Sequence, residues 1–288
     1  MDDSPTTGDE EGGGSGTAGE RFSAFAKRNV LLVAVFFLSN LVTAVSTLVT
    51  AVTVLRDSRT DWHAAEYRKL RELRAGYTLE KFRKELGPPV FRTPLPSGDG
   101  FVRNVYRPRP EYWVEVISNK IDASVTYAVT SCDPSFRPAF SYGGSRVARD
   151  VVLNQNTLAD VLPAEDLNGQ SLKVFFGGTG SSDSLVFQVY GGGGGTDYRE
   201  FAWGLNDVCP WQGKNTGRDL RAPWYDWYAD HRPAEDPPAY TYVDRQVDAA
   251  ARSLMTESVV NTYAETAVAE DMLTYYPSQI GVSRLTVQ

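Results

Sequence analysis

Histidine and cysteine, which supply most transition-metal ligands and many nucleophiles, are scarce in this chain. It contains two histidines, His63 and His231, and two cysteines, Cys132 and Cys209. Because no CxxC pair or Cys/His cluster is present, the spacing that holds zinc is absent, and we expect neither a metal nor a cofactor. The cysteines leave two alternatives open: a Cys132–Cys209 disulfide in a region outside the cytoplasm, or two buried free thiols.

A phosphate-binding loop is also missing, although glycine is locally abundant. The runs Gly191–Gly195 and Gly177–Gly180 are followed by no Lys-Ser or Lys-Thr pair to reach phosphates and magnesium. Five consecutive glycines between two strand-like segments are typical of a flexible hairpin loop. We therefore assign no nucleotide site.

Positive charge is absent from the first twenty residues, and the chain has a formal net charge of -7. That segment is rich in Gly, Ser, Thr and acids, so it has too little apolar surface to offset the entropy of folding. We predict a disordered acidic tail over residues 1–27. The overall negative charge also argues against nucleic acid as a partner.

The strongest positive signal is the run Val30–Leu55, which is 26 residues long and contains no charge. About 20 such residues cross a hydrocarbon core of ~30 Å, so we predict one transmembrane helix over residues 28–55. A cleaved signal peptide is the weaker alternative, because its apolar region runs only ~7–15 residues. The prediction is a single-pass membrane protein in contact with membrane lipid.

One stripe of this predicted span is polar. Its members recur at spacings of three and four residues and are Asn40, Thr43, Thr47 and Thr50. Small and hydroxylated residues allow close helix approach in lipid, and an intramembrane Asn favours a partner. We predict self-association through this stripe; the alternative is that the hydroxyls bond to carbonyls of their own helix.

The orientation of the span follows from the basic residues near its ends. The N-terminal flank contains Arg21, Lys27 and Arg28, and the C-terminal flank contains Arg56, Arg59, Arg68, Lys69, Arg71 and Arg74. This bias favours a cytoplasmic C-terminal region. The pairs nearest the span are equal in number, so an extracytoplasmic C-terminal region remains the alternative.

Beyond the span we predict an α+β fold. A juxtamembrane helix is expected within 56–76, a small α+β domain over 77–133 and a second α+β region over 145–288. Thr78 is placed to cap a helix over Leu79–Leu86, whose Leu and Phe residues share one face. Alternating patterns predict a hairpin from Tyr112–Ile117 and Ser124–Thr130.

The second region shows weaker patterns. They predict strands at Leu172–Phe176, Leu185–Tyr190, Arg199–Leu205 and Val282–Val287, and helical segments at Tyr242–Met255 and Ser258–Ala264.

Residues 62–131 resemble the small αα-plus-sheet domain of the BamE/SmpA family. The residues that carry the resemblance are Tyr77-Thr78-Leu79, Phe82, Leu86-Gly87-Pro88 and the Tyr112–Thr130 hairpin. Members of that family are lipidated outer-membrane assembly factors, whereas this chain has no lipid-acceptor cysteine near its start. The resemblance therefore implies a fold and no site residues.

The segment Ala222–Pro233 is the most distinctive candidate site. It places aromatic rings beside acids and a histidine, namely Trp224, Tyr225, Asp226, Trp227, Tyr228 and His231. Such rings stack on sugars or grip cations, so this is the predicted ligand-binding segment. The alternative, which we favour, is an aromatic-rich loop that folds back over the core and leaves its acids in water. No catalytic residue is assigned, because no Ser or Cys nucleophile lies nearby.

Our leading hypothesis is a membrane-anchored, non-enzymatic binding protein with an unknown protein partner. One alternative is a membrane-tethered, hydrolase-like effector that uses His231 with Asp226 or Asp230. Another is a cell-envelope assembly accessory, which requires the folded region to face outward.

Overall fold

The structure is a computed structural model. It describes residues 45–47, 62–95, 100–143, 149–161, 173–177, 185–192, 198–211, 213–214, 217–231, 241–244, 249–276 and 280–287. The chain divides into two compact units, Met1–Trp62 and His63–Gln288. In the first, residues 45–47 are helical. Among the residues described, none of the helices combines the length and apolar character needed to cross a bilayer.

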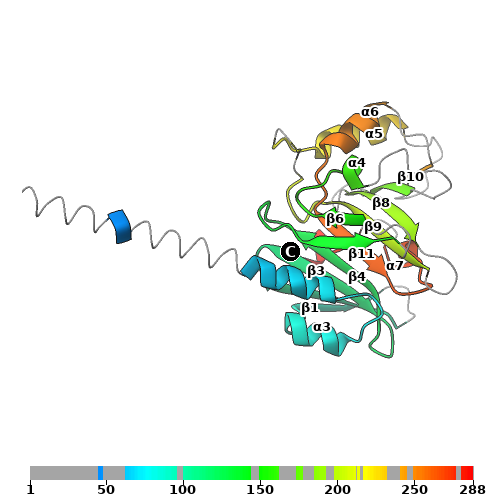
Figure 1. The fold of residues 1–288 in the computed structure, drawn as a ribbon. Helices are drawn as coiled ribbons and strands as arrows, with labels where there is room; N and C mark the ends of the chain where they lie inside the picture. Colours follow the sequence, from blue (N-terminus) through cyan, green and yellow to red (C-terminus); the bar gives the residue numbers. More distant parts are fainter. Residues whose placement is uncertain are drawn as a thin grey trace, which may run out of the picture. The chain divides into compact units, whose positions relative to one another are not determined.

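The second unit is organised around a nine-stranded sheet (Figure 1). The order is β1-β2-β3-β4-β11-β9-β8-β7-β10, and all neighbours are antiparallel. The strands are β1 (Phe91–Pro94), β2 (Val102–Arg109), β3 (Tyr112–Ser118), β4 (Ser124–Ser131), β7 (Lys173–Gly177), β8 (Leu185–Gly192), β9 (Arg199–Asn206), β10 (Thr241–Asp244) and β11 (Thr262–Thr266). A separate pair consists of β5 (Ala139–Tyr142) and β6 (Arg149–Val152).

The central strands are buried on both sides of the sheet. Every residue of β3, β4 and β11 is buried. Because successive strand residues point to opposite faces, each of these strands needs two covering layers. We call the two sides the helical face, where Tyr127 and Tyr263 lie, and the C-terminal face, where Ala128 and Ala264 lie.

Two helices cover the helical face beside β1–β4 (Figure 1). The first spans 62–72 and buries Glu66 and Leu70, and Leu73, the residue that follows the helix, is buried as well. The second, α3 (Leu79–Leu86), buries Leu79, Phe82 and Leu86.

The β5–β6 pair covers the adjoining part of the helical face. The Phe140 ring stacks on the Tyr263 ring with centroids 4.5 Å apart, and the Tyr142 ring lies 4.6 Å from that of Trp203. Aromatic contacts of this kind add to the free energy gained by burial. They position β5–β6 over β11 and β9.

The C-terminal face is covered by the last part of the chain. Met272, Tyr275, Tyr276 and Ile280 pack with Ala128, Ala202 and Ala264 in one apolar cluster. The helix α7 (Met272–Tyr275) is tied to β9, because the backbone N–H of Met272 donates to Glu200 Oε2 at 2.6 Å. The small alanine side chains leave room for these large rings.

Several local predictions are confirmed. The helix Leu79–Leu86 forms with Thr78 as its N-cap, and it ends at Gly87, whose φ of 84° favours glycine. The Tyr112–Ile117 and Ser124–Thr130 strands form a hairpin as β3 and β4. The fold class is α+β, with a mainly antiparallel sheet. The predicted regions 77–133 and 145–288 share this one sheet, because β4 pairs with β11.

Two predictions of element type are wrong and one is right in part. The helix predicted at Tyr242–Met255 is present in its second half as α6 (Ala249–Glu257), whereas its first residues belong to the strand β10. Ser258–Ala264 is not helical, and its last residues open β11, because pairing on both edges and burial on both faces outweigh local helix preference. The predicted strand Val282–Val287 contains the helix α8 (Arg284–Val287), and the Val282 carbonyl accepts a hydrogen bond from Asn206 Nδ2.

The predicted loop at Ala222–Pro233 is also different. Residues Arg221–His231 form the helix α5, which lies beside α6 at the end of the sheet away from α3 (Figure 1). Asp219 Oδ1 accepts the backbone N–H of Arg221 at 3.0 Å at its start, and Pro223 is tolerated in the first turn. Trp224 and Trp227, three positions apart, then share the buried side.

Candidate functional site

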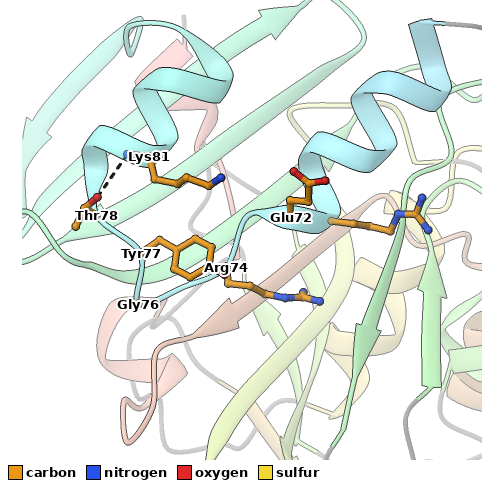
Figure 2. Close-up of a pocket in the computed structure, with 7 residues that line it drawn as sticks. Glu72, Arg74, Gly76, Tyr77, Thr78 and Lys81 are labelled. Carbon is orange, nitrogen blue, oxygen red and sulfur yellow. Dashed lines mark hydrogen bonds between the residues drawn. The ribbon is translucent and has the colours of Figure 1, made fainter.

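An open depression lies where the helix 62–72 ends and α3 begins (Figure 2). Its volume is about 650 Å³. The residues that line it are Arg71, Glu72, Arg74, Gly76, Tyr77, Thr78 and Lys81. All of them come from eleven consecutive positions, so the site is formed by one corner of the chain and the ends of the two helices.

The corner is fixed to β4 through Ser124. The Gly76 backbone N–H donates to the Ser124 carbonyl at 2.8 Å and lies 3.0 Å from Ser124 Oγ. In return, the Ser124 backbone N–H and its Oγ donate to the Tyr77 carbonyl at 2.8 and 2.7 Å. The φ of Gly76 is 94°, a left-handed value that favours glycine. Folding thus orders this turn in advance of any ligand.

A buried carboxylate holds the residues just before the turn. Glu265 on β11 is 1% exposed. Its Oε1 accepts the backbone N–H of Ala75 at 2.8 Å, and its Oε2 lies 3.2 Å from Arg74 Nη1. Tyr263 Oη also donates to Oε2 at 2.8 Å. The carbonyl of Ala75 is also bonded, because Arg199 Nη1 donates to it at 3.2 Å.

Burial dominates the electrostatics of Glu265. Removal from water raises the pKa of its carboxyl, while Arg74 and the hydrogen bond from Ala75 act in the opposite direction. The pKa of Arg74 is raised: burial acts to lower it, but the Glu265 carboxylate together with Tyr263 and Tyr127 outweighs that effect. The ion pair therefore orients the Arg74 guanidinium at the edge of the depression.

The outer lining combines both charges with an aromatic ring. Tyr77 is 42% exposed, and Glu72 and Arg71 are exposed. Lys81 Nζ lies 3.4 Å from Glu85 Oε1. Arg71 donates from Nε to the Tyr67 carbonyl at 3.4 Å. Figure 2 shows the side chains of Tyr77, Glu72 and Lys81 around a common opening.

The lining of the depression consists of charged, hydroxyl-bearing and aromatic side chains around Gly76. Its lining contains no histidine or cysteine. His63 instead packs against Tyr67 and Phe136, with ring centroids 5.7 Å away in both cases. Among the residues described, no three His, Cys, Asp or Glu side chains come together as a metal site.

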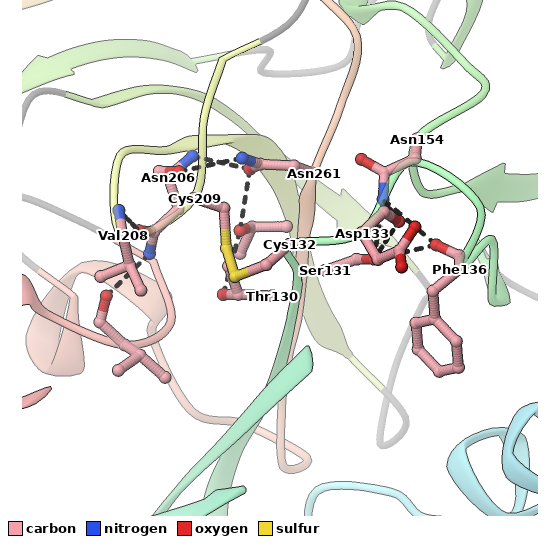
Figure 3. The surroundings of a disulfide bond; sticks show 12 residues. Thr130, Ser131, Cys132, Asp133, Phe136, Asn154, Asn206, Val208, Cys209 and Asn261 are labelled. Carbon is pink, nitrogen blue, oxygen red and sulfur yellow. Dashed lines mark hydrogen bonds between the residues drawn. A yellow bond between two sulfur atoms is a disulfide. The ribbon is translucent and has the colours of Figure 1, made fainter. Parts of the chain in front are cut away.

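The two cysteines form a disulfide (Figure 3). It joins the residue after β4 to a residue shortly after β9, across the end of β11, with a Cα–Cα distance of 4.8 Å. Beside it, the Asn206 backbone N–H donates to Asn261 Oδ1 at 2.7 Å, and Asn261 Nδ2 donates to the Asn206 carbonyl at 2.9 Å. The end of the central sheet is therefore covalently closed and hydrogen-bonded.

Two of the predicted ligand-binding aromatics are buried. Trp224 is 2% exposed and its Nε1 donates to Ser258 Oγ at 2.8 Å. Trp227 is 6% exposed, and its ring contacts that of Trp224 edge to face. Tyr225 points outward and is 62% exposed. The tryptophans thus hold α5 on the fold, as the alternative interpretation of this segment proposed.

The other members of the predicted segment are distributed along α5. Asp226 is exposed. The backbones of Tyr228 and His231 belong to the helix, and their side chains lie outside the described part of the structure. In the predicted membrane stripe, Thr47 is helical and exposed. Asn40, Thr43 and Thr50, like most of residues 28–55, lie outside the described residues.

Sequence reasoning missed the depression because its residues look like an ordinary amphipathic helix end. One signal was available: Gly76 and Tyr77 separate two short basic helices, so the chain must turn there with an aromatic residue at the corner. The anchor Glu265, 190 positions after Ala75, had no local signal.

Comparison with known proteins found no matching family model, curated protein or solved structure. The resemblance to the BamE/SmpA family therefore stays a prediction.

Proposed function

We propose that residues 63–288 form an extracytoplasmic binding domain, held to the cell membrane by the predicted helix over residues 28–55. The main support is the Cys132–Cys209 disulfide. Disulfides persist in oxidising compartments and are rare in the cytosol. This observation favours the extracytoplasmic alternative over the weak charge bias at the ends of the span.

The depression supports binding as the role of the domain. Its floor is ordered by hydrogen bonds to Ser124 and Glu265, while the Tyr77 ring and the Glu72 carboxylate remain at the surface. Preorganised groups lose little entropy when a ligand binds. The hydrolase hypothesis depends on His231, whose side chain lies outside the described part of the structure, so it has no comparable support.

Self-association of the span remains part of the proposal, through the stripe that contains Asn40 and Thr47. An Asn40→Leu variant should lose crosslinked dimer in membranes, whereas Ser39→Ala should not. Equal crosslinking of both variants would remove the stripe from the proposal.

Thiol labelling tests the location. Intact cells are treated with a membrane-impermeant maleimide, with and without prior treatment with an impermeant phosphine reductant. The chain has two cysteines, so we expect no labelling without reductant and labelling of two thiols after it. Labelling only after lysis, with no need for reductant, would place the domain in the cytoplasm and overturn the proposal.

A control keeps the readout specific. The Cys132→Ser/Cys209→Ser variant should remain unlabelled under all conditions. A second control is a single new cysteine in the acidic tail, at Ser15 of that variant. We expect this site to react only after lysis, because one span places the tail and the domain on opposite sides.

A further inference from the structure

The balance of charges around the depression narrows the class of ligand. Three cations line it: Arg71, Arg74 and Lys81. Three carboxylates match them, since Glu72 lies in the same lining and Glu265 and Glu85 are bonded to Arg74 and Lys81. A site for phosphate or for an acidic polymer requires an excess of positive charge. The depression has none, so its formal charges favour a neutral ligand.

The exposed polar groups of the depression include both hydrogen-bond donors and hydrogen-bond acceptors. Glu72 makes no hydrogen bond or ion pair with the described residues, and the Tyr77 hydroxyl likewise has no partner there. The Arg71 guanidinium uses Nε on the Tyr67 carbonyl and has no carboxylate partner in the described part of the chain. Planar carboxylate and guanidinium groups bind adjacent hydroxyls in pairs, as they bind each other.

The exposed ring completes the pattern. Tyr77 follows the Gly76 turn, and its backbone is fixed by two bonds from Ser124. A pyranose ring has an apolar C–H face and a rim of hydroxyls, so it stacks on an aromatic ring while polar groups bind the rim. A depression of about 650 Å³ has room for a short chain of such rings.

We propose that the depression formed by the helix 62–72 and α3 binds a neutral oligosaccharide. Tyr77 is the stacking platform, and Glu72, Arg71 and Arg74 bind the sugar hydroxyls. This inference rests on the proposed role of the domain as an extracytoplasmic binder, and it names the class of ligand for that site.

Saturation-transfer NMR on the full-length chain tests the inference. The protein is kept in an amine-oxide detergent, because glucoside and maltoside detergents would compete as ligands. Three probes are used: linear tetrasaccharides of glucose, of mannose and of N-acetylglucosamine. We expect saturation of aromatic protons to reach at least one probe, most strongly at the protons on one face of its rings.

The variants separate stacking from other contacts. Tyr77→Ala should weaken binding by about tenfold or more, whereas Tyr77→Phe should stay within about threefold. Glu72→Gln should weaken it by about fivefold. Tyr225→Ala is the matched control, because this exposed tyrosine lies on α5 and should leave binding unchanged. The unfolding midpoint of each variant shows that it is folded.

The outcomes are decisive. No transfer to any of the three probes overturns the inference, as does equal binding by wild type and Tyr77→Ala. Binding of inorganic pyrophosphate that is lost in Arg71→Gln would replace the oligosaccharide with an anion. Sugar binding by a chain whose thiols are reduced and cytoplasmic would leave the ligand assignment standing and refute the location. An extracytoplasmic domain that contains the disulfide but binds no sugar would confirm the location and refute the ligand assignment.

Discussion

Arg74 and Glu265 lie 191 positions apart in the chain, yet Arg74 Nη1 is 3.2 Å from Glu265 Oε2. The glutamate is buried in the central strand β11, and the arginine is half-buried at the end of the helix 62–72. This pair, together with the bond from Ala75 to the same carboxylate, connects the depression to the middle of the sheet.

Removal of Arg74 should destabilise the fold. An Arg74→Met variant retains the aliphatic stem but leaves the Glu265 carboxylate buried without its cation. We expect a loss of about 1–3 kcal/mol, below the range for fully buried pairs because Arg74 is partly solvated. Adding Glu265→Gln should recover part of this loss, since an amide has no charge to bury. Urea unfolding gives both values.

The control for that change is Lys81→Met, which removes the partner of Glu85 in a more exposed pair. Its effect should stay within about 0.5 kcal/mol. If Arg74→Met lowers the free energy of unfolding by no more than Lys81→Met does, the buried pair does not stabilise the fold more than the exposed one.

The contributions of Glu265 and Glu66 to the stability of the fold should depend on pH in opposite directions. Burial raises the pKa of Glu265 above the ordinary value of 4.5. Its contribution to stability is therefore fully present below that value and is lost as pH rises through the folded pKa. The destabilisation by Arg74→Met should shrink as the solution is acidified, because the protonated carboxyl needs no cation.

Glu66 provides the opposite case. Burial acts to raise its pKa, but hydrogen bonds from Tyr112 and Lys69, together with the positive charges of Lys69 and Arg109, hold it below 4.5. Its contribution is present above 4.5 and is lost as pH falls through the folded pKa. The advantage of wild type over Glu66→Gln should thus disappear on acidification. Unfolding curves across pH 3–7 check both signs, and a pH-independent difference in either variant would contradict the assignment.

Loss of the disulfide should weaken the whole domain. It closes a loop with a sequence separation of 77 residues. The Cys132→Ser/Cys209→Ser variant should lose about 2–5 kcal/mol of unfolding free energy, because the unfolded chain regains the entropy of that loop. Wild type in the presence of reductant should show a similar loss, whereas the variant should be insensitive to reductant. Equal stability of oxidised and reduced wild type would contradict the bond.

Neighbouring aromatic residues on α5 should behave differently. Trp224→Ala removes a buried ring and its bond to Ser258, so we expect a loss of about 3–5 kcal/mol. Tyr225→Ala removes an exposed ring and should change stability by no more than about 0.5 kcal/mol. Thermal and urea unfolding compare the two. Similar effects would mean that Trp224 is not part of the core.

Local signals predicted the elements whose determinants lie within one turn or one hairpin. Thr78, the spacing of Leu79, Phe82 and Leu86, and Gly87 all act within ten residues, and the helix they predict is present. The β3–β4 hairpin is present for the same reason, because its turn at Asn119 uses that side chain as an acceptor for the N–H groups of Ile121 and Ala123.

Tertiary context decided the elements that local signals predicted wrongly. Residues 258–264 have a helix-compatible composition, but Thr262–Thr266 is inserted between β4 and β9 and gains partners on both edges. The tryptophans at positions 224 and 227 were compatible with a ligand surface and with a place in the core. An aromatic cluster has the same sequence in either case.

Patterns within the sequence were enough to predict the α+β class, the capped helix after Gly76, the β3–β4 hairpin and an apolar run long enough to cross a membrane. The contacts of Cys132 with Cys209, and of Glu265 with Arg74 and Ala75, become visible only in the folded chain. They form because β11 joins β4 to β9, through burial on two faces and pairing on two edges. Those energies depend on paired residues that lie 58 to 140 positions apart, which no local pattern contains.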